Sequence, residues 1–249
     1  MAGHSKWANI KHRKARQDAV RGKAWSKCSR AIIMAAKNGG GDPTMNLTLR
    51  YAIDEAKAAN MPKDTIEKAV KKGAGELEGI NYEEVRYEGY GPNGVAVMID
   101  CLTDNVNRTA PEIRKIFEKF GGKLGVNGSV AFGFSQRGLI TFDTSAVTED
   151  QLMEIALDAG AEDIKNEDDQ WEVITQPTDF LTVKEALQKA GLEPKSAQVT
   201  MIPQTTVICR DKNAKKIIHL MEEFEDHDDV QKVYANFDIP EDELAKLEE

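Results

Sequence analysis

The apolar positions in the first third of the chain recur with the period of a helix. Ala24, Cys28, Ala31 and Ala35 share one face of a segment that ends at the glycines 39–41. The same spacing predicts two more helices, with apolar positions at Leu49, Ala52, Ile53 and Ala56 in the second and at Ile66, Ala69 and Val70 in the third. We therefore expect a small helical domain.

Turn residues indicate the limits of these helices. The second helix is expected to begin at Asp42-Pro43, because proline costs little in the first turn of a helix. It should end where Pro62 interrupts the pattern, and the third helix should end at Gly73. A glycine-rich link at 73–79 then separates the helices from the rest of the chain.

Beyond residue 79 the pattern alternates between the periods of strands and helices. The predicted strands lie at 82–90, 95–102, 130–134, 139–142, 161–165, 171–175, 197–202, 205–209 and 230–235. Four amphipathic helices lie between them, around Ile116, Ile155, Ala186 and Leu220. The order from 139 to 202 is β-α-β-β-α-β, which is typical of a ferredoxin-like domain. The flanking segments 95–134 and 205–235 each have the order βαβ.

These elements predict an α+β fold, in which a small N-terminal helical bundle is followed by two ferredoxin-like α/β sandwich domains, one inserted in the other. The expected parts are a basic N-terminal arm at 1–22, a helical domain at 23–78, a ferredoxin-like domain at 79–137 plus 204–249, and an inserted ferredoxin-like domain at 138–203.

Charge is distributed very unevenly along the 249 residues, whose formal net charge is −9. Residues 1–75 hold 16 Lys or Arg against 6 Asp or Glu, a net of +10, and the remaining 174 residues hold 17 against 36, a net of −19. Nine of the basic residues fall within the first thirty positions. Such asymmetry indicates a polyanion-binding segment attached to an acidic body.

The basic arm supplies most of the candidate nucleic-acid-binding residues. They are Lys6, Trp7, Lys11, His12, Arg13, Lys14, Arg16, Arg21, Lys23, Lys27 and Arg30. Closely spaced cations neutralise backbone phosphates and release counterions, which gives binding that depends on salt and little on sequence. Trp7 is suited to stacking on an unpaired base. The alternative is a disordered, solubilising tail, with Trp25 in the core of the first helix.

A polar loop at 103–109 supplies the other candidates. It lies between a predicted strand and a helix that is expected to begin near Ala110-Pro111. Free backbone N–H groups at a helix start, together with Asn105, Asn107 and Arg108, suit phosphate binding. The alternative is that a side chain of this loop only caps the helix and turns the chain.

Other patterns argue against catalysis and against bound cofactors. The GxGxxG match at 89–94 is followed by a strand-like segment, so it predicts a hairpin turn and not a dinucleotide site. The four histidines and three cysteines lack metal-ligand spacing, and the cysteines are expected to be buried thiols. The acidic run at 222–229 lacks the spacing of a calcium loop and is expected to be a solvated face. We expect no enzyme, no metal ion, no cofactor and no small-molecule substrate.

The chain start does not predict export. No apolar stretch of signal-peptide length follows the basic N-terminus, and the apolar run at 31–36 is too short to span a bilayer. We therefore expect a cytoplasmic protein with no membrane partner.

Several long motifs resemble the YebC/PmpR family. They include MAGHSKWANIKHRK, YEGYGPNGVAVMIDCLTDNVNRT and FGGKLGVNGSVAFGF, and the resemblance extends from Met1 to Pro240. It implies a cytoplasmic protein with a helical N-terminal domain and two α/β domains. The chain departs from the family at Val106, where a basic residue is common, whereas Asn105, Asn107, Arg108 and Thr109 match.

The resemblance implies a role in gene expression without catalysis. Members are commonly described as probable DNA-binding transcriptional regulators, while some resemble ribosome-associated translation factors that relieve stalling. The expected partner is therefore nucleic acid, either DNA or the rRNA of the ribosome. An adaptor that binds another protein through its sheets is the remaining alternative, and low sensitivity to salt would favour it.

Overall fold

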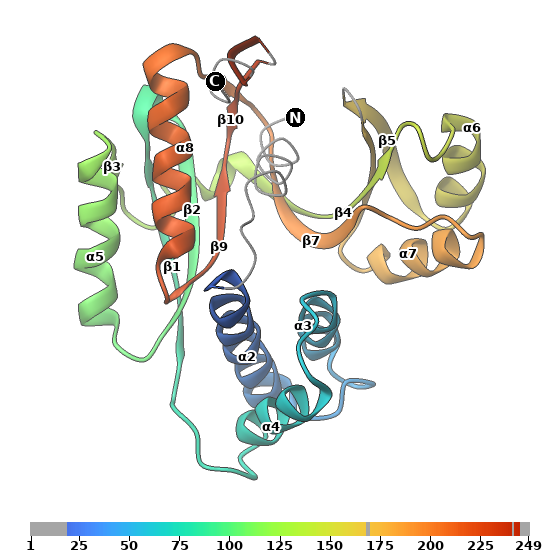
Figure 1. Ribbon diagram of the computed structural model, residues 1–249, viewed down its shortest axis with the longest axis horizontal. Helices are drawn as coiled ribbons and strands as arrows, with labels where there is room; N and C mark the ends of the chain where they lie inside the picture. Colours follow the sequence, from blue (N-terminus) through green and yellow to red (C-terminus); the bar gives the residue numbers. More distant parts are fainter. Residues whose placement is uncertain (1–18, 168–169, 241, 245–249) are drawn as a thin grey trace. The chain divides into compact units, whose positions relative to one another are not determined.

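The computed structural model describes residues 19–167, 170–240 and 242–244 (Figure 1). The chain forms two compact units. One unit is Phe132–Thr206, and the other combines the described residues before Phe132 with those after Thr206. The predicted boundaries of the inserted domain, 138 and 203, lie inside the first of these units.

The described part of the larger unit begins with three helices: α2 (Ala19–Gly39), α3 (Leu47–Ala58) and α4 (Lys63–Gly73). Their buried core includes Ala35, Leu49 and Ala56, as the helical periodicity predicted, and Ile32, which the predicted apolar face did not include. This part of the fold therefore follows directly from the apolar spacing of the sequence.

Helix α3 begins at Leu47, so the predicted start at Asp42-Pro43 was wrong. The Asp42 carboxylate accepts hydrogen bonds from the backbone N and hydroxyl of Thr44, which makes a turn instead of a helix. Asn46 is the N-cap, because its Oδ1 accepts from Leu49 N at 3.0 Å. Its Nδ2 also donates to Ala35 O at 2.8 Å, which ties the start of α3 to α2.

An antiparallel four-stranded sheet forms the centre of the larger unit, in the order β3-β1-β2-β9. The strands are β1 (Glu83–Tyr90), β2 (Ala96–Thr103), β3 (Lys123–Leu124) and β9 (Val230–Ala235). Helices α5 (Val106–Lys119) and α8 (Asp211–Asp226) cover one face (Figure 1). Phe117 and Phe224 meet edge to face between them, with ring centroids 4.8 Å apart. Residues 89–94 turn the chain between β1 and β2, which confirms the predicted hairpin.

One predicted strand of this unit was wrong, and another is present but lies outside the main sheet. Within the segment 130–134, Ala131–Gly133 form a 3₁₀ turn, and the strand beside β1 is the short β3. In the segment 205–209, β8 (Val207–Ile208) pairs in parallel with β10 (Phe237–Asp238), apart from the main sheet. In the main sheet the strand beside β2 is instead β1, which comes from earlier in the chain. The βαβ pattern alone does not show whether this strand comes from 82–90 or from 205–209.

The unit Phe132–Thr206 has the predicted β-α-β-β-α-β order. Its elements are β4 (Phe134–Asp143), α6 (Glu149–Leu152, continued by a π-helical turn at Met153–Leu157), β5 (Ala161–Glu167), β6 (Gln170–Thr175), α7 (Phe180–Lys189) and β7 (Ser196–Pro203). The strand order is β5-β6-β4-β7, and all neighbours are antiparallel. The α+β class with two ferredoxin-like sheets is thus confirmed.

Candidate nucleic-acid interface

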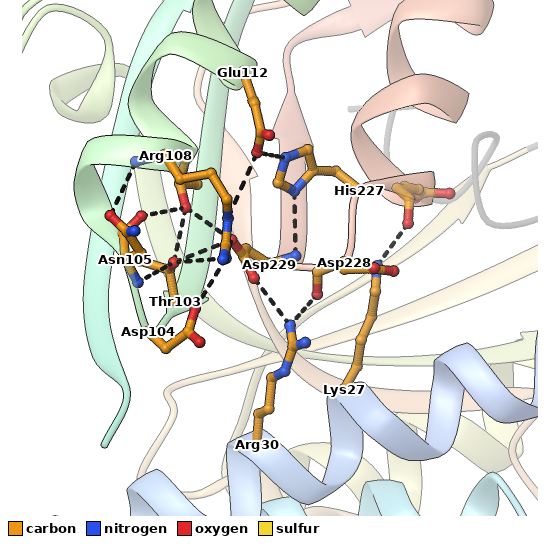
Figure 2. Close-up of polar contacts among 12 residues, drawn as sticks. Lys27, Arg30, Thr103, Asp104, Asn105, Arg108, Glu112, His227, Asp228 and Asp229 are labelled. Carbon is orange, nitrogen blue, oxygen red and sulfur yellow. Dashed lines mark hydrogen bonds and ion pairs between the residues drawn. The ribbon is translucent and has the colours of Figure 1, made fainter. Parts of the chain in front are cut away.

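A buried carboxylate lies at the centre of the polar residues that follow α8. The side chain of Asp229, in the short link between α8 and β9, is only 5% exposed. Its Oδ2 accepts hydrogen bonds from Arg108 Nη2 at 2.6 Å, Thr109 Oγ1 at 2.8 Å and Thr103 Oγ1 at 3.0 Å (Figure 2). Burial opposes the charge, but these three donors outweigh it and lower the pKa of Asp229.

The loop before α5 is held by this same carboxylate. Asn105 is the N-cap of α5, since its Oδ1 accepts from Arg108 N at 3.1 Å. The guanidinium of Arg108 also donates to Asp104 Oδ1 at 2.9 Å. The capping alternative for this loop therefore holds for Asn105, while Asn107 is exposed. Helix α5 begins at Val106, about one turn before the expected start, because the cap lies at Asn105.

The basic residues of α2 contact the end of α8. Lys23 Nζ donates to Asp226 O at 3.1 Å, and Lys27 Nζ donates to Glu225 O at 2.6 Å. Arg30 donates to the carbonyl oxygen of Asp228 and lies 3.3 Å from Asp229 Oδ1 (Figure 2). The last turn of α8 contains no basic residue of its own. Cations from α2 thus satisfy carbonyl oxygens at the negative end of the α8 dipole.

The interpretation of 222–229 as a solvated acidic face was therefore wrong for part of the run. Asp229 is buried, and the backbone carbonyls of Glu225, Asp226 and Asp228 are acceptors for α2. The sequence contained one usable indication. The last turn of α8 is acidic, although anions at a helix C-terminus are unfavourable unless a cation from elsewhere compensates them.

His227 connects α5 to the same link. Its Nε2 lies 3.0 Å from Glu112 Oε2, and its Nδ1 accepts from the backbone N of Asp229 at 3.2 Å. Because Nδ1 is an acceptor, the ring proton belongs on Nε2, where it can be donated to Glu112. The imidazole thus fixes the backbone that carries Asp229.

These residues surround a pocket of about 540 Å³. Its lining consists of Lys23, Arg30, Ile80, Tyr82, Asp104, Arg108, Glu112, Asp226, His227, Asp228 and Asp229. Five carboxylates thus face three Lys or Arg side chains, and all three of these cations have acidic partners. Phosphate binding inside this pocket would have to compete with those carboxylates.

Helix α4 presents its lysines differently. Lys68, Lys71 and Lys72 are exposed, and none of their side chains forms an ion pair or hydrogen bond within the described part of the chain. Lys63 lies 3.7 Å from Glu67, one helical turn away. The lysines of α4 are therefore available to an external anion, whereas those of α2 already have internal acceptors.

The remaining candidates lie outside the described residues, namely Lys6, Trp7, Lys11, His12, Arg13, Lys14 and Arg16, and the side chain of Arg21 is likewise not described. Trp25 belongs to the helical part, where it packs against the core and its Nε1 donates to Ala59 O at 3.0 Å. The structure thus brings together Lys23, Lys27, Arg30 and Arg108.

A second buried carboxylate holds the loop after β3. Glu88, on β1, is 4% exposed and accepts hydrogen bonds from the backbone N atoms of Gly128, Val130 and Ala131 at 2.7–2.8 Å. Burial opposes its charge, but the three amides outweigh burial and lower the pKa of Glu88. This contact fixes the GVNGSVA segment, which no sequence argument connected with Glu88.

Comparisons with known proteins agree across the whole chain. Residues 5–76 match the family model described as TACO1/YebC protein N-terminal domain, and residues 82–237 match the model of the TACO1/YebC second and third domain. The chain belongs to the TACO1/YebC family. This finding confirms the resemblance that the sequence motifs indicated.

Relatives within the family are similar over their full length. A protein of Natranaerobius thermophilus is 56% identical over 242 residues, covering 96% of this chain and 97% of that protein. One of Geobacter sulfurreducens is 53% identical over 247 residues, covering 99% and 100%. Both are named probable transcriptional regulatory proteins. The crystal structure of a conserved hypothetical protein from Aquifex aeolicus has a TM-score of 0.79 at 48% identity, covering 90% of this chain and 93% of that one.

Metal-ligand clusters and membrane-spanning helices are both absent from the described residues. No group of three or more His, Cys, Asp or Glu residues is arranged to hold a metal ion within 19–167, 170–240 and 242–244. In the same part of the chain, no helix is both long and apolar enough to cross a membrane. Cys101 and Cys209 are buried free thiols, and Cys28 is partly buried.

Proposed function

We propose that this protein is a non-enzymatic regulator of gene expression that binds duplex DNA through its basic N-terminal third. The observation that carries the proposal is the charge reversal, a net of +10 in residues 1–75 of a chain with a net of −9. Such a segment binds phosphates electrostatically while the acidic remainder turns away from the same polyanion. The names of the relatives as probable transcriptional regulatory proteins support a regulatory role.

The lysines of α4 support a phosphate contact by the helical part. Lys68, Lys71 and Lys72 extend the basic character of the arm to an exposed helix, and their side chains form no ion pair with a carboxylate of the described residues. Lysine is a point charge with rotatable donors, so it suits phosphate oxygens more than base edges. We therefore propose binding that is strongly salt-dependent and weakly sequence-specific.

The test measures affinity for a 20-bp duplex by fluorescence anisotropy as a function of salt. Full-length protein is compared with a Lys11/Arg13/Lys14/Arg16→Gln variant. Each lost phosphate contact makes the slope of log K against log salt shallower by about 0.9, so up to about 3.6 is expected. The matched control is Lys165/Lys184/Lys189/Lys195→Gln, which removes the same charge from the inserted unit and should retain most of the affinity.

Ribosomes distinguish the regulator from a translation factor. Protein is sedimented with purified ribosomes at physiological salt, with and without an excess of the duplex. Release of the protein by DNA supports the proposal. If the protein stays on ribosomes despite the DNA, and the arm variant falls off, the translation role replaces it. An interaction with a protein partner would leave both variants bound alike and would respond little to salt.

A further inference from the structure

We propose that α2 acts as an electrostatic latch, which nucleic acid opens by competing for Lys23, Lys27 and Arg30. In the closed state these cations bind the C-terminal end of α8 and Asp229. In the open state phosphates take the place of those acceptors, and α2–α4 separate from α8 and β9. The inference rests on the proposed function, because it concerns how the same basic segment is made available.

The cations of α2 hold the latch through polar contacts. Met98, Leu102 and Tyr234 are buried on β2 and β9 and belong neither to the apolar core of the helical part nor to that of the sheet with α5 and α8. Across the boundary, Lys232 Nζ lies 2.6 Å from Glu55 Oε1, in addition to the three cations of α2. The guanidinium of Arg30 also lies over the Tyr82 ring, 5.5 Å from its centroid. Partly exposed ion pairs of this kind are individually weak and are screened by salt.

The oxygen acceptors at the end of α8 are similar in charge to the phosphate oxygens of a nucleic-acid backbone. Carbonyl oxygens at a helix C-terminus carry partial negative charge, and Asp229 adds a full one. Phosphate oxygens offer the same kind of acceptor to Lys and Arg. The donors that Lys23, Lys27 and Arg30 direct at the end of α8 have to turn away from it when a phosphate takes them. Binding and docking therefore compete.

The charge order of α8 explains why the latch stays closed without a polyanion. Lys212, Lys215 and Lys216 lie near its start, whereas Glu222, Glu223, Glu225 and Asp226 lie near its end, which is the reverse of what the helix dipole favours. The acidic end therefore depends on cations from α2. Without a competing anion, separation would leave that end uncompensated.

Cys28 supplies a probe of the latch in the unmodified chain. It lies on α2, is partly buried, and is close enough to the Glu55–Lys232 pair to be influenced by both charges. Burial, followed by the charge of Glu55, raises the pKa of its thiol, so iodoacetamide should react slowly in the closed state. Burial also raises the pKa of the Cys101 thiol to about 12, so this thiol reports on global unfolding.

The experiment follows alkylation of each cysteine by peptide mass spectrometry while a 20-bp duplex is added to the full-length protein. At saturating DNA we expect Cys28 to react at least about fivefold faster, with Cys101 unchanged, because only local opening exposes α2. An unchanged Cys28 rate at a DNA concentration where anisotropy shows saturation would overturn the latch while leaving the proposed function intact.

Salt tests the latch independently of DNA binding. If the duplex does not bind, the proposed function fails, but raising NaCl from 50 to 500 mM should still accelerate Cys28 alkylation because it screens the same contacts. Heparin should have the same effect at low salt. A Cys28 rate that responds to neither salt nor heparin overturns the latch as well.

A pair of variants tests the predicted competition. Asp226→Asn/Asp228→Asn weakens the acidic side of the latch and keeps every cation of α2. It should bind the duplex about two- to fivefold more tightly than an Asp150→Asn/Asp158→Asn control, which changes the net charge equally in the inserted unit. Equal affinity of the two variants would show that the latch does not compete with DNA.

Discussion

Helices α2 and α4 carry similar numbers of cations, but the structure uses them in different ways. Lys23, Lys27 and Arg30 of α2 donate to backbone or carboxylate oxygens at the end of α8. Lys68, Lys71 and Lys72 of α4 are exposed and have no such acceptors among the described residues. Clustered charge in a sequence therefore locates a basic segment, but it does not separate cations that hold the protein together from those that an external anion can reach.

The largest effect is expected from removing the acceptor that α2 shares with α5. Asp229→Ala removes the charged acceptor of two buried threonine hydroxyls, Thr103 and Thr109, and deprives Arg108 of its shortest ion pair. Loss of one partner of a buried, hydrogen-bonded charge should lower the free energy of unfolding by about 3 kcal/mol. Urea denaturation followed by circular dichroism measures this change.

Asp228 provides the control for that variant. Its side chain is exposed, and the carbonyl that binds Arg30 belongs to the backbone, so Asp228→Ala should change the free energy of unfolding by less than about 0.5 kcal/mol. If both alanine variants are equally stable, the carboxylate of Asp229 does not anchor the link between α8 and β9, and the contrast between α2 and α4 loses its main support.

The second effect concerns α4. Lys68/Lys71/Lys72→Gln should weaken binding of a 20-bp duplex at least about tenfold at 0.1 M salt and make the salt slope shallower by about 3, one for each phosphate contact. Thermal stability should remain unchanged, because the side chains of these lysines form no ion pair or hydrogen bond within residues 19–167, 170–240 and 242–244. Fluorescence anisotropy and a melting curve measure the two quantities.

Three lysines of the inserted unit provide a charge-matched comparison. Lys184/Lys189/Lys195→Gln removes the same charge, so any effect that it shares with the α4 variant comes from net charge and not from contact. Equal losses of affinity in the two variants would place the phosphate contacts elsewhere in the basic third of the chain.

Acid should destabilise the protein through two buried carboxylates, Asp229, which binds α2, and Glu88, which holds the loop after β3. The folded pKa values of Asp229 and Glu88 lie below those of the unfolded chain, about 3.9 and 4.3. Their stabilisation is therefore complete above those unfolded values and is lost as the pH falls through the folded values. Melting temperatures from pH 7 to pH 3 should fall steeply below about pH 4.

Asparagine at position 229 separates the contribution of the anchor from general acid unfolding. Asp229→Asn cannot be protonated there, so its melting temperature should start lower at pH 7 and fall less steeply in acid. Parallel curves for the two proteins would mean that Asp229 is not responsible for the acid sensitivity.

The apolar pattern predicted most of the fold because the buried positions of a helix or strand recur with the period of that element. Helices α2 and α4 and the inserted β-α-β-β-α-β unit followed from spacing alone. The failures were at positions where local hydrogen bonds decide. Because of the turn at Asp42, α3 begins later in the chain than predicted, and because Asn105 is the N-cap, α5 begins earlier than predicted. The source of the central strand β1 depends on pairing between distant segments, which periodicity does not encode.

The site was less predictable, because its partners come from distant parts of the sequence. Arg30 and Asp229 are 199 positions apart, and Thr103 and Asp229 are 126 apart. Residue types identified Arg30 and Arg108 as candidates, but no local pattern indicated that both side chains would bind the carboxylate of Asp229. Only the acidic end of α8, which opposes the helix dipole, pointed to a missing cation.

The smallest effect tests a single hydrogen bond of the anchor. Thr109 lies in the first turns of α5 with no exposed surface, and its hydroxyl is 2.8 Å from Asp229 Oδ2. Thr109→Val keeps the side-chain shape and removes one of the donors that lower the pKa of Asp229. A charged acceptor makes this bond worth about 1.5–2 kcal/mol, and the remaining donors to Asp229 should limit the loss in free energy of unfolding to about 1 kcal/mol.

The control is Thr48→Val, on the exposed side of α3. It makes the same change in helix propensity without a buried acceptor and should be nearly neutral. A loss in both variants would reflect the difference in helix propensity between threonine and valine. A loss confined to Thr109→Val, and reduced below pH 4, would assign it to the carboxylate that holds α2.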